Sequence, residues 1–147
     1  MTEDNVRLSR NEYFMDIAIL TGKRGTCDRA FVGAIVVKDK RIIMSGYNGS
    51  PSGISHCGEE HQMINNHCVK TVHAEANIIA NAAKFGISLI GSSLYVTLQP
   101  CFDCMKLLIS AGIFEVIYLE KKEDERTPAE YYKLIHIKQY WRNKDGN

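Results

Sequence analysis

The sequence lacks any long run of apolar residues. None of its hydrophobic stretches approaches the roughly 20 residues that a membrane-spanning helix requires. Its first ten residues, MTEDNVRLSR, also lack the apolar core of a secretory signal peptide. These absences argue against a membrane partner and against secretion, and we expect the chain to work in the cytoplasm.

An excess of charge of one sign is also missing. The 18 Lys and Arg residues nearly balance the 17 Asp and Glu residues, for a net charge of +1. Because a protein that wraps nucleic acid needs a broad basic surface, we do not expect a nucleic-acid partner. A small anionic ligand is compatible with this balance, since it needs only one local pocket.

Repeats, low-complexity segments and linkers are absent from the 147 residues. This length suits one domain with a hydrophobic core, and we expect a single domain over residues 1–147. The cysteines are odd in number: Cys27, Cys57, Cys68, Cys101 and Cys104. In a chain without a secretion signal, clustered Cys and His favour metal sites over disulfides.

The first half of the chain predicts a helix and a β-hairpin. Ser9 and Glu12 form a capping box that opens a helix ending near Gly22. Residues 31–47 predict two strands, joined by a turn at Lys38-Asp39-Lys40. Residues 55–70 are polar and rich in Cys and His, which predicts an irregular insertion.

The second half predicts a strand–helix–strand unit, with strands at 94–98 and 114–119 and a helix at about 100–111. A right-handed crossover between parallel strands is expected for such a unit. Before it, Thr71 is a candidate cap for a helix that ends near Phe85. The spacing of apolar residues predicts a core face made of Ala76, Ile79, Ala80 and Ala83.

The last part of the chain begins with a charged loop at residues 121–126, which is typical of solvated surface. A helix is expected from Thr127, followed by a final strand at 135–141. Together these elements predict an α/β fold of three layers, α-β-α, with a mixed sheet of about five strands.

Two short motifs carry the chemistry: His73-Ala74-Glu75 and Pro100-Cys101-Phe102-Asp103-Cys104. Together they match the H-x-E … P-C-x-x-C pattern known for zinc-dependent nucleobase deaminases. We expect each motif in the first turn of a helix, where the two cysteines share one face and can reach one metal. Because His73, Cys101 and Cys104 supply only three ligands, the fourth tetrahedral position of a catalytic zinc stays open for water.

Glu75 is the candidate proton carrier beside this zinc. A positioned general acid–base group contributes about 10²–10⁴ to a reaction rate. Each motif alone is unspecific, because a C-x-x-C pair also occurs in redox sites and in closed structural zinc sites. The two motifs together, in this order, favour a catalytic site.

From about Asn11 to Leu119 the chain resembles the cytidine and deoxycytidylate deaminase superfamily. More narrowly it is similar to the deoxycytidylate (dCMP) deaminases, including the bacterial competence operon protein 2 branch. The resemblance rests on both motifs with their flanks, on residues 26–34 and 46–53, and on His67-Cys68. It implies a cytidine deaminase-like fold and the zinc-dependent hydrolysis of dCMP to dUMP and ammonia, which supplies dUMP for thymidylate synthesis.

The resemblance also implies a homo-oligomer, often a hexamer, that dCTP activates and that dTTP inhibits with Mg²⁺. Asn48 and Asn77 would contact the nucleotide, Asn77 through a sugar hydroxyl, although Asn48 also suits a simple turn. Lys84 and Arg29 are candidates for binding the phosphate. Taken alone, each is more typical of a surface charge.

Some phage and bacterial relatives hold a second, structural zinc, for which the candidate ligands here are Cys27, Cys57, His67 and Cys68. His56 and His61 are alternatives, because neighbouring side chains such as those of His67 and Cys68 usually diverge. The opposing interpretation is three buried free cysteines. A second zinc would explain how the insertion at 55–70, with its low apolar content, is held in place.

Rival functions stay open. Other zinc deaminases act on cytidine, guanine, a riboflavin-pathway pyrimidine or adenosine in tRNA. A protein of another class would be a nonenzymatic, zinc-stabilised interaction module in DNA uptake, and such a module would have no need of Glu75.

Overall fold

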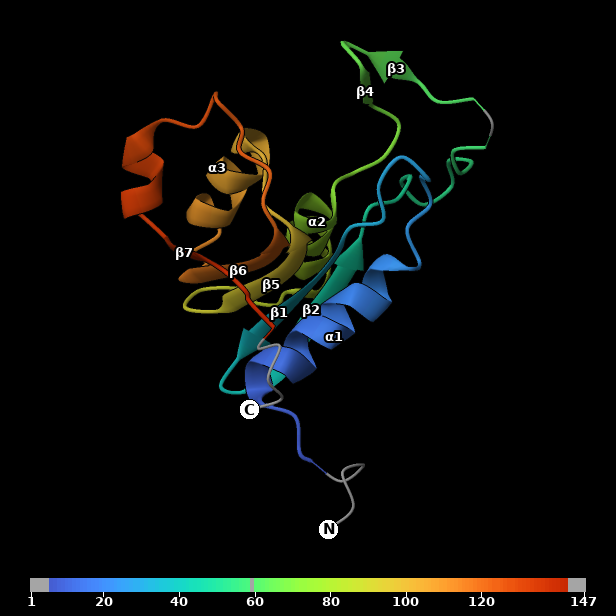
Figure 1. Ribbon diagram of the computed structural model, residues 1–147. Helices are drawn as coiled ribbons and strands as arrows, with labels where there is room; N and C mark the ends of the chain where they lie inside the picture. The colour runs from blue at the N-terminus through green and yellow to red at the C-terminus, as the bar shows by residue number, and fades with distance from the viewer. Residues whose placement is uncertain (1–5, 59, 143–147) are drawn as a thin grey trace.

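A mixed five-stranded sheet with helices on both faces forms the centre of the protein (Figure 1). The computed structural model describes residues 6–58 and 60–142. The strand order is β2-β1-β5-β6-β7, with the bounds β1 Gly33–Lys38, β2 Arg41–Tyr47, β5 Ser93–Leu98, β6 Glu115–Glu120 and β7 His136–Gln139. The predicted α/β fold with a mixed sheet of about five strands is confirmed.

Strand direction changes across the sheet. β1 pairs antiparallel with β2 and with β5, whereas β6 pairs parallel with β5 and with β7. The β1–β2 hairpin turns at Asp39 and Lys40, whose positive φ angles of 50° and 65° suit a two-residue turn. Helix α3 (Phe102–Ser110) connects β5 to β6, so the predicted strand–helix–strand unit is confirmed.

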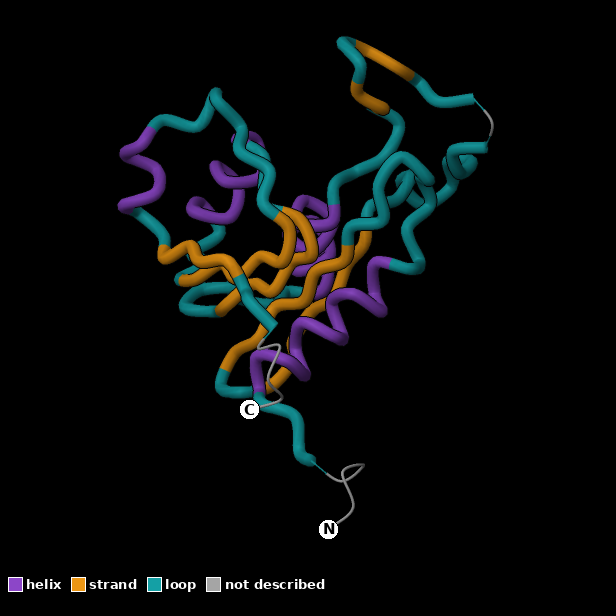
Figure 2. The backbone as a smooth tube through the Cα atoms, in the orientation of Figure 1, coloured by secondary structure: helices purple, strands orange, loops and turns teal. Residues whose placement is uncertain are grey.

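The helices form the two outer layers of the fold (Figures 1 and 2). Helix α1 (Arg10–Gly22) covers one face of the sheet, and α2 (Ala74–Phe85) and α3 cover the other. Successive side chains of a strand point to opposite faces, so Ile35 of β1 packs with α1 while Val36 packs with α2 and α3. The sheet therefore separates two apolar cores.

Helix α1 begins at the predicted capping box. The Ser9 hydroxyl accepts a hydrogen bond from the Glu12 amide, and the Glu12 carboxylate accepts one from the Ser9 amide. Helix α2 begins at Ala74 with His73 as its N-cap residue, so the prediction of a cap at Thr71 is wrong. The chain is still extended at Val72, which pairs with Gly49 in an isolated β-bridge.

The core face of α2 also differs from the prediction. The buried apolar residues are Ala74, Ile78 and Ala82, whereas Ala80 and Ala83 are exposed and Ala76 and Ile79 are half-buried. Spacing could not decide between these faces, because small apolar residues surround the helix. As a consequence Glu75, next to Ala74, is turned into the protein.

Helix α2 lies directly against β2 at Gly46. A β-carbon at this position would stand 2.8 Å from Cγ1 of Ile78 and 3.1 Å from the carbonyl oxygen of Ala74. Glycine therefore permits the close approach. Because Ala74 separates His73 from Glu75, this contact fixes the start of α2.

The Cys- and His-rich insertion contains a short hairpin that extends away from the main sheet (Figure 1). Its strands are β3 (Met63–Ile64) and β4 (His67–Cys68). The turn residues Asn65 and Asn66 have φ angles of 48° and 63°, a left-handed conformation that asparagine tolerates. The expectation of a wholly irregular insertion is therefore wrong.

After β6 the chain forms a loop and a short 3-10 helix, η2 (Ala129–Lys133), where a full helix was expected. The Tyr131 ring packs edge-on against Phe102 at the start of α3, with 5.2 Å between ring centroids. Within residues 6–58 and 60–142, no helix has both the length and the apolarity needed to cross a membrane.

Candidate active site

The starts of α2 and α3 bring His73, Cys101 and Cys104 together. Nδ1 of His73 lies 3.6 Å from Sγ of Cys101 and 3.4 Å from Sγ of Cys104. Cys104 is in the first turn of α3, but Cys101 and His73 are N-cap residues, one position earlier than predicted. In this position their side chains leave the helix ends and point toward each other.

The spacing of these atoms fits tetrahedral zinc. With Zn–S bonds of about 2.3 Å and Zn–N bonds of about 2.0 Å, a tetrahedral ion would hold nitrogen and sulfur ligands about 3.5 Å apart. In the described part of the chain, no further His, Cys, Asp or Glu joins these three within 4.8 Å. A metal held here would keep one position open for water or substrate.

The two cysteines differ in acidity. A hydrogen bond from Cys104 and the nearby His73 lower the pKa of Cys101 to about 4, against the effect of burial. The ionised Cys101, together with burial, raises the pKa of Cys104 above its ordinary value. Without metal the pair therefore holds one proton, which must leave when both sulfurs bind a metal.

Glu75 lies beside this group of ligands, only 4 % exposed. Burial raises the pKa of its carboxyl group, and the Cys104 side chain is within hydrogen-bonding reach. A carboxyl group with a raised pKa can both accept and return a proton near neutral pH. The structure thus brings Glu75 and the three predicted ligands together.

A second cluster joins the loop after α1 to the insertion. Its ligand atoms lie within 4.8 Å of one another and belong to Cys27, Cys57, His61 and Cys68. Sγ of Cys27 is 3.5 Å from Nδ1 of His61, and the Cys57 and Cys68 sulfurs are 3.6 Å apart. Two sulfurs on tetrahedral zinc would be about 3.8 Å apart, so this donor set also fits the ion.

His67 does not belong to this cluster, although it was a predicted ligand. It precedes Cys68 in β4, where neighbouring side chains point to opposite sides, and it is exposed. His61, one of the two alternatives, takes its place, while His56 lies outside the group. Nε2 of His61 is 3.0 Å from the Asp28 carboxylate, a partner that the sequence analysis missed although it directly follows Cys27.

This carboxylate–histidine pair is the arrangement that commonly orients a metal-binding imidazole. The cluster also contains one acidic and one weakly acidic thiol. Burial and the neighbouring Cys68 raise the pKa of Cys57 to about 11. Burial opposes ionisation of Cys68, but the Lys70 amide and His61 outweigh it and lower its pKa to about 6.

Asn48 and Asn77 brace the segments next to His73. Both ends of the buried Asn48 amide are engaged, because Oδ1 accepts from the Val32 amide at 2.8 Å and Nδ2 donates to the Ala30 carbonyl at 2.6 Å. Nδ2 of Asn77 donates to the Tyr47 carbonyl at 2.9 Å. Asn48 therefore holds the loop after α1, and Asn77 holds the end of β2 to α2.

The two phosphate candidates, Arg29 and Lys84, make other contacts in the structure. Arg29 donates to the Asn66 carbonyl at 3.2 Å and so ties its loop to the β3–β4 turn. Lys84 is in the last turn of α2, with Nζ 5.7 Å from the centre of the Phe85 ring. Lys84 lies nine positions after Glu75 in the helix, which is a rise of about 14 Å. The structure does not bring Lys84 to the metal group of the same chain.

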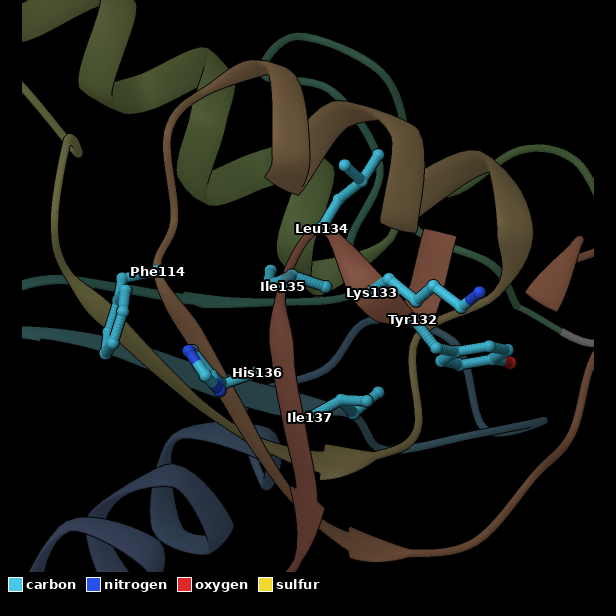
Figure 3. Close-up of a pocket in the computed structure, with 7 residues that line it drawn as sticks. All are labelled: Phe114, Tyr132, Lys133, Leu134, Ile135, His136 and Ile137. Atoms are coloured by element: carbon cyan, nitrogen blue, oxygen red, sulfur yellow. The ribbon is translucent and has the colours of Figure 1, made fainter. Parts of the chain in front are cut away.

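A surface hollow of about 410 Å³ contains no residue of either cluster. Its lining comes from Phe114 and from residues 132–137, and the His136 ring rests against Phe114 with 4.8 Å between centroids (Figure 3). No group of metal-binding side chains faces it. The chemistry of the zinc-binding group therefore identifies the candidate active site better than the hollow does.

Comparison with known proteins places this site in a family. The family described as the cytidine and deoxycytidylate deaminase zinc-binding region matches residues 8–120. ComE operon protein 2 of Bacillus subtilis (strain 168) is 49% identical over 115 residues, which are 78% of this chain and 61% of that protein. The deoxycytidylate deaminase of Mycobacterium phage D29 is 38% identical over 121 residues, which are 74% of this chain and 92% of the phage protein.

A solved structure agrees with the fold and with the sequence match. The dCMP deaminase of cyanophage S-TIM5, in complex with dCMP and dUMP, superposes with a TM-score of 0.80 at 30% identity. The match covers 92% of this chain and 100% of the phage chain. Because the family match includes both motifs and most of the sheet, the chain belongs to the cytidine and deoxycytidylate deaminase family.

Proposed function

We propose that this chain catalyses the zinc-dependent hydrolysis of dCMP to dUMP and ammonia. The observation that carries the proposal is the meeting of a buried carboxyl group, Glu75, with three ligand atoms that suit an open zinc site. The relatives named deoxycytidylate deaminase support the substrate, as does the cyanophage structure that holds dCMP and dUMP.

The zinc ligands and Glu75 have separate chemical roles. Zinc bound by His73, Cys101 and Cys104 would supply a Lewis acid that makes water a usable nucleophile near neutral pH. Ionised Glu75 accepts a proton from the water whose oxygen forms the new bond to C4 of the pyrimidine. The same carboxyl group passes this proton to ring nitrogen N3, then takes the proton of the hydroxyl group added at C4 and gives it to the amine, so that C4 becomes a carbonyl carbon, the C4–N4 bond breaks and ammonia leaves.

Among the candidate substrate contacts, Asn77 has the strongest support. Its Nδ2 donates a hydrogen bond to the Tyr47 carbonyl, which leaves the side-chain oxygen to accept a hydrogen bond from a sugar hydroxyl. Asn48 would act by holding the loop that borders the substrate. Arg29, exposed on that loop, is the phosphate candidate within one chain, whereas Lys84 could serve only the site of another copy.

We also propose that the second cluster holds a structural zinc, with His61 in place of His67. Support comes from the four donor atoms within 4.8 Å and from the Asp28–His61 pair. A tetrahedral ion with four protein ligands has no open position, which is typical of structural zinc. Metal analysis tests this proposal, because a fully active preparation with one zinc per chain would exclude the second site.

Further parts of the proposal rest on the family resemblance. These are a hexameric or smaller homo-oligomer, activation by dCTP, and inhibition by dTTP with Mg²⁺. The single domain over residues 1–147 rests on the length of the sequence and on its lack of linkers. All five cysteines are unbridged, which supports a reducing compartment such as the cytoplasm.

A comparison of substrates tests the proposed function. Turnover of dCMP, deoxycytidine, CMP and a tRNA anticodon stem is measured by ammonia release and by chromatography of the products, with and without dCTP and Mg²⁺. We expect dCMP to have the highest kcat/KM, and dCTP to change a sigmoidal dCMP curve into a hyperbolic one. Equal turnover of deoxycytidine and dCMP, or no turnover by a zinc-loaded preparation, would contradict the proposal.

A further inference from the structure

The loop after β6 is attached to the segment that carries both zinc-binding cysteines. Oδ2 of Asp124 accepts a hydrogen bond from the backbone amide of Phe102, 2.9 Å away. Phe102 is the first residue of α3 and directly follows Cys101. Three residues before Phe102, the Gln99 side-chain oxygen accepts a hydrogen bond from the Lys122 amide at 3.1 Å. The loop, expected from sequence to be only a charged surface, thus contacts the chain on both sides of Cys101.

Helix α3 needs a capping group from outside its own sequence. Its N-cap residue is Cys101, whose side chain makes no capping hydrogen bond because its sulfur faces His73. An N-cap Ser or Asp would normally satisfy a free amide of the first turn. The Asp124 carboxylate instead supplies an acceptor at this end, for the amide of Phe102. A negative charge near a helix N-terminus is also favourable.

Arg126 holds Asp124 in this position. Its NH2 group is 2.7 Å from Oδ2 and its Nε is 3.0 Å from Oδ1 of the same carboxylate, a two-point contact that fixes the carboxylate plane. NH1 of Arg126 reaches Oδ2 of Asp103, between the two cysteines, at 3.1 Å. Lys106 is 3.2 Å from the other oxygen of Asp103, so the two carboxylates near the cysteines face two cations.

We propose that Asp124, oriented by Arg126, is a positioning residue for the catalytic zinc. It fixes the first turn of α3, and through that turn it fixes the directions of the Cys101 and Cys104 sulfurs. The inference rests on the proposed zinc site but not on the identity of the substrate. Residues that hold metal ligands in place without binding the metal typically change metal affinity or activity by about 10–100-fold when they are lost.

Asp124→Ala and the milder Asp124→Asn and Arg126→Lys test the proposal in the full chain. Glu123→Gln is the matched control, because Glu123 is in the same loop and pairs with Lys121 at 2.8 Å. The rate of zinc release is measured for each variant with a chelator that changes colour when it binds zinc. The kinetic phase that is missing in Cys104→Ser belongs to the catalytic zinc, and the remaining phase belongs to the second cluster. Spectra of the cobalt-substituted proteins report the geometry of the sulfur ligands directly.

We expect Asp124→Ala to release the catalytic zinc about 10–100-fold faster than the control and to shift the cobalt absorption bands. With dCMP, kcat should fall while KM stays within about threefold, since the substrate contacts are not altered. If Asp124→Ala does not fold, Asp124→Asn and Arg126→Lys should each show a smaller change in the same direction. Release rates and cobalt spectra equal to those of Glu123→Gln would overturn the proposal. Because neither readout needs turnover, a failure of the proposed dCMP activity would leave this result interpretable.

Discussion

Replacement of Glu75 by glutamine separates the chemical role of this side chain from its structural role. Glutamine has nearly the same shape but cannot accept or return the protons that deamination moves. Loss of a general acid–base group costs about 10²–10⁴ in kcat, which is about 2.7–5.5 kcal/mol in the activation barrier. The upper end is expected here, because the other nearby carboxylate, Asp103, is exposed and already paired with Lys106 and Arg126. Among the described residues, no further His, Asp or Glu joins the three ligands to take over the proton transfer.

The same substitution should stabilise the metal-free protein at neutral pH. Burial raises the pKa of Glu75 above its ordinary value, so the folded chain binds its proton more tightly than the unfolded chain does. The free energy of unfolding therefore falls as the pH rises from the ordinary pKa of a glutamate through the raised pKa of Glu75 in the folded chain. The loss is about 1.36 kcal/mol for each unit by which these two pKa values differ. Because glutamine does not ionise, the Glu75→Gln variant should not lose this stability when the pH rises above the raised pKa of Glu75.

Three measurements check the prediction. Steady-state kinetics on dCMP should show the fall in kcat, and metal analysis should show unchanged zinc content. Urea unfolding of chelator-treated protein at pH 4 and pH 8 should show a stability advantage for Glu75→Gln at the higher pH only. Glu130→Gln, at an exposed position of η2, serves as the control. A zinc-loaded Glu75→Gln variant with full activity would refute the assignment of Glu75 as the proton carrier. If Glu75→Gln and the unchanged protein were equally stable at pH 8 as well as at pH 4, the argument from burial would be refuted.

Three further predictions follow from the geometry. Gly46→Ala should cost about 1–3 kcal/mol of stability, seen as a lower Tm, and should reduce kcat, because its β-carbon would press on Ile78 and on the start of α2; an unchanged Tm would contradict the close packing. Cys57→Ser should reduce bound zinc from two ions to one, whereas His67→Ala should keep both; the reverse result would restore His67 as a ligand. Lys84→Ala should leave KM for dCMP within about twofold, since about 14 Å of helix separates this residue from Glu75 of its own chain; a KM raised for dCMP but not for deoxycytidine would show that Lys84 binds the phosphate in the site of another copy.

Local signals predicted much of the fold because they do not depend on distant contacts. Ser9 and Glu12 form their capping box within one helical turn, and Asp39 and Lys40 form the two-residue turn of their hairpin. Positions that depend on tertiary pairing were predicted less well. The start of α2 moved to Ala74, since Val72 pairs with Gly49 from a distant loop.

In the candidate site, too, local motifs were predicted well and contacts between distant residues were not. The ligands His73, Cys101 and Cys104 are found from residue type and spacing, because each motif has no more than five residues. Local reasoning counted against His67, since it is next to Cys68, but the choice of His61 over His56 depends on how the insertion folds toward Cys27. Asp124 was assigned to a solvated loop because its partner, the Phe102 amide, lies 22 residues earlier in the chain.

The central place of β5 has a consequence for the reactivity of the five thiols. This strand has hydrogen-bonded neighbours on both sides and leads directly into Cys101, so its amides should be among the slowest to exchange with deuterium. Cys57 and Cys68 belong to an outlying segment with little apolar burial, which should open far more often. An alkylating agent added to the metal-free protein should therefore label the outlying pair long before it reaches Cys104.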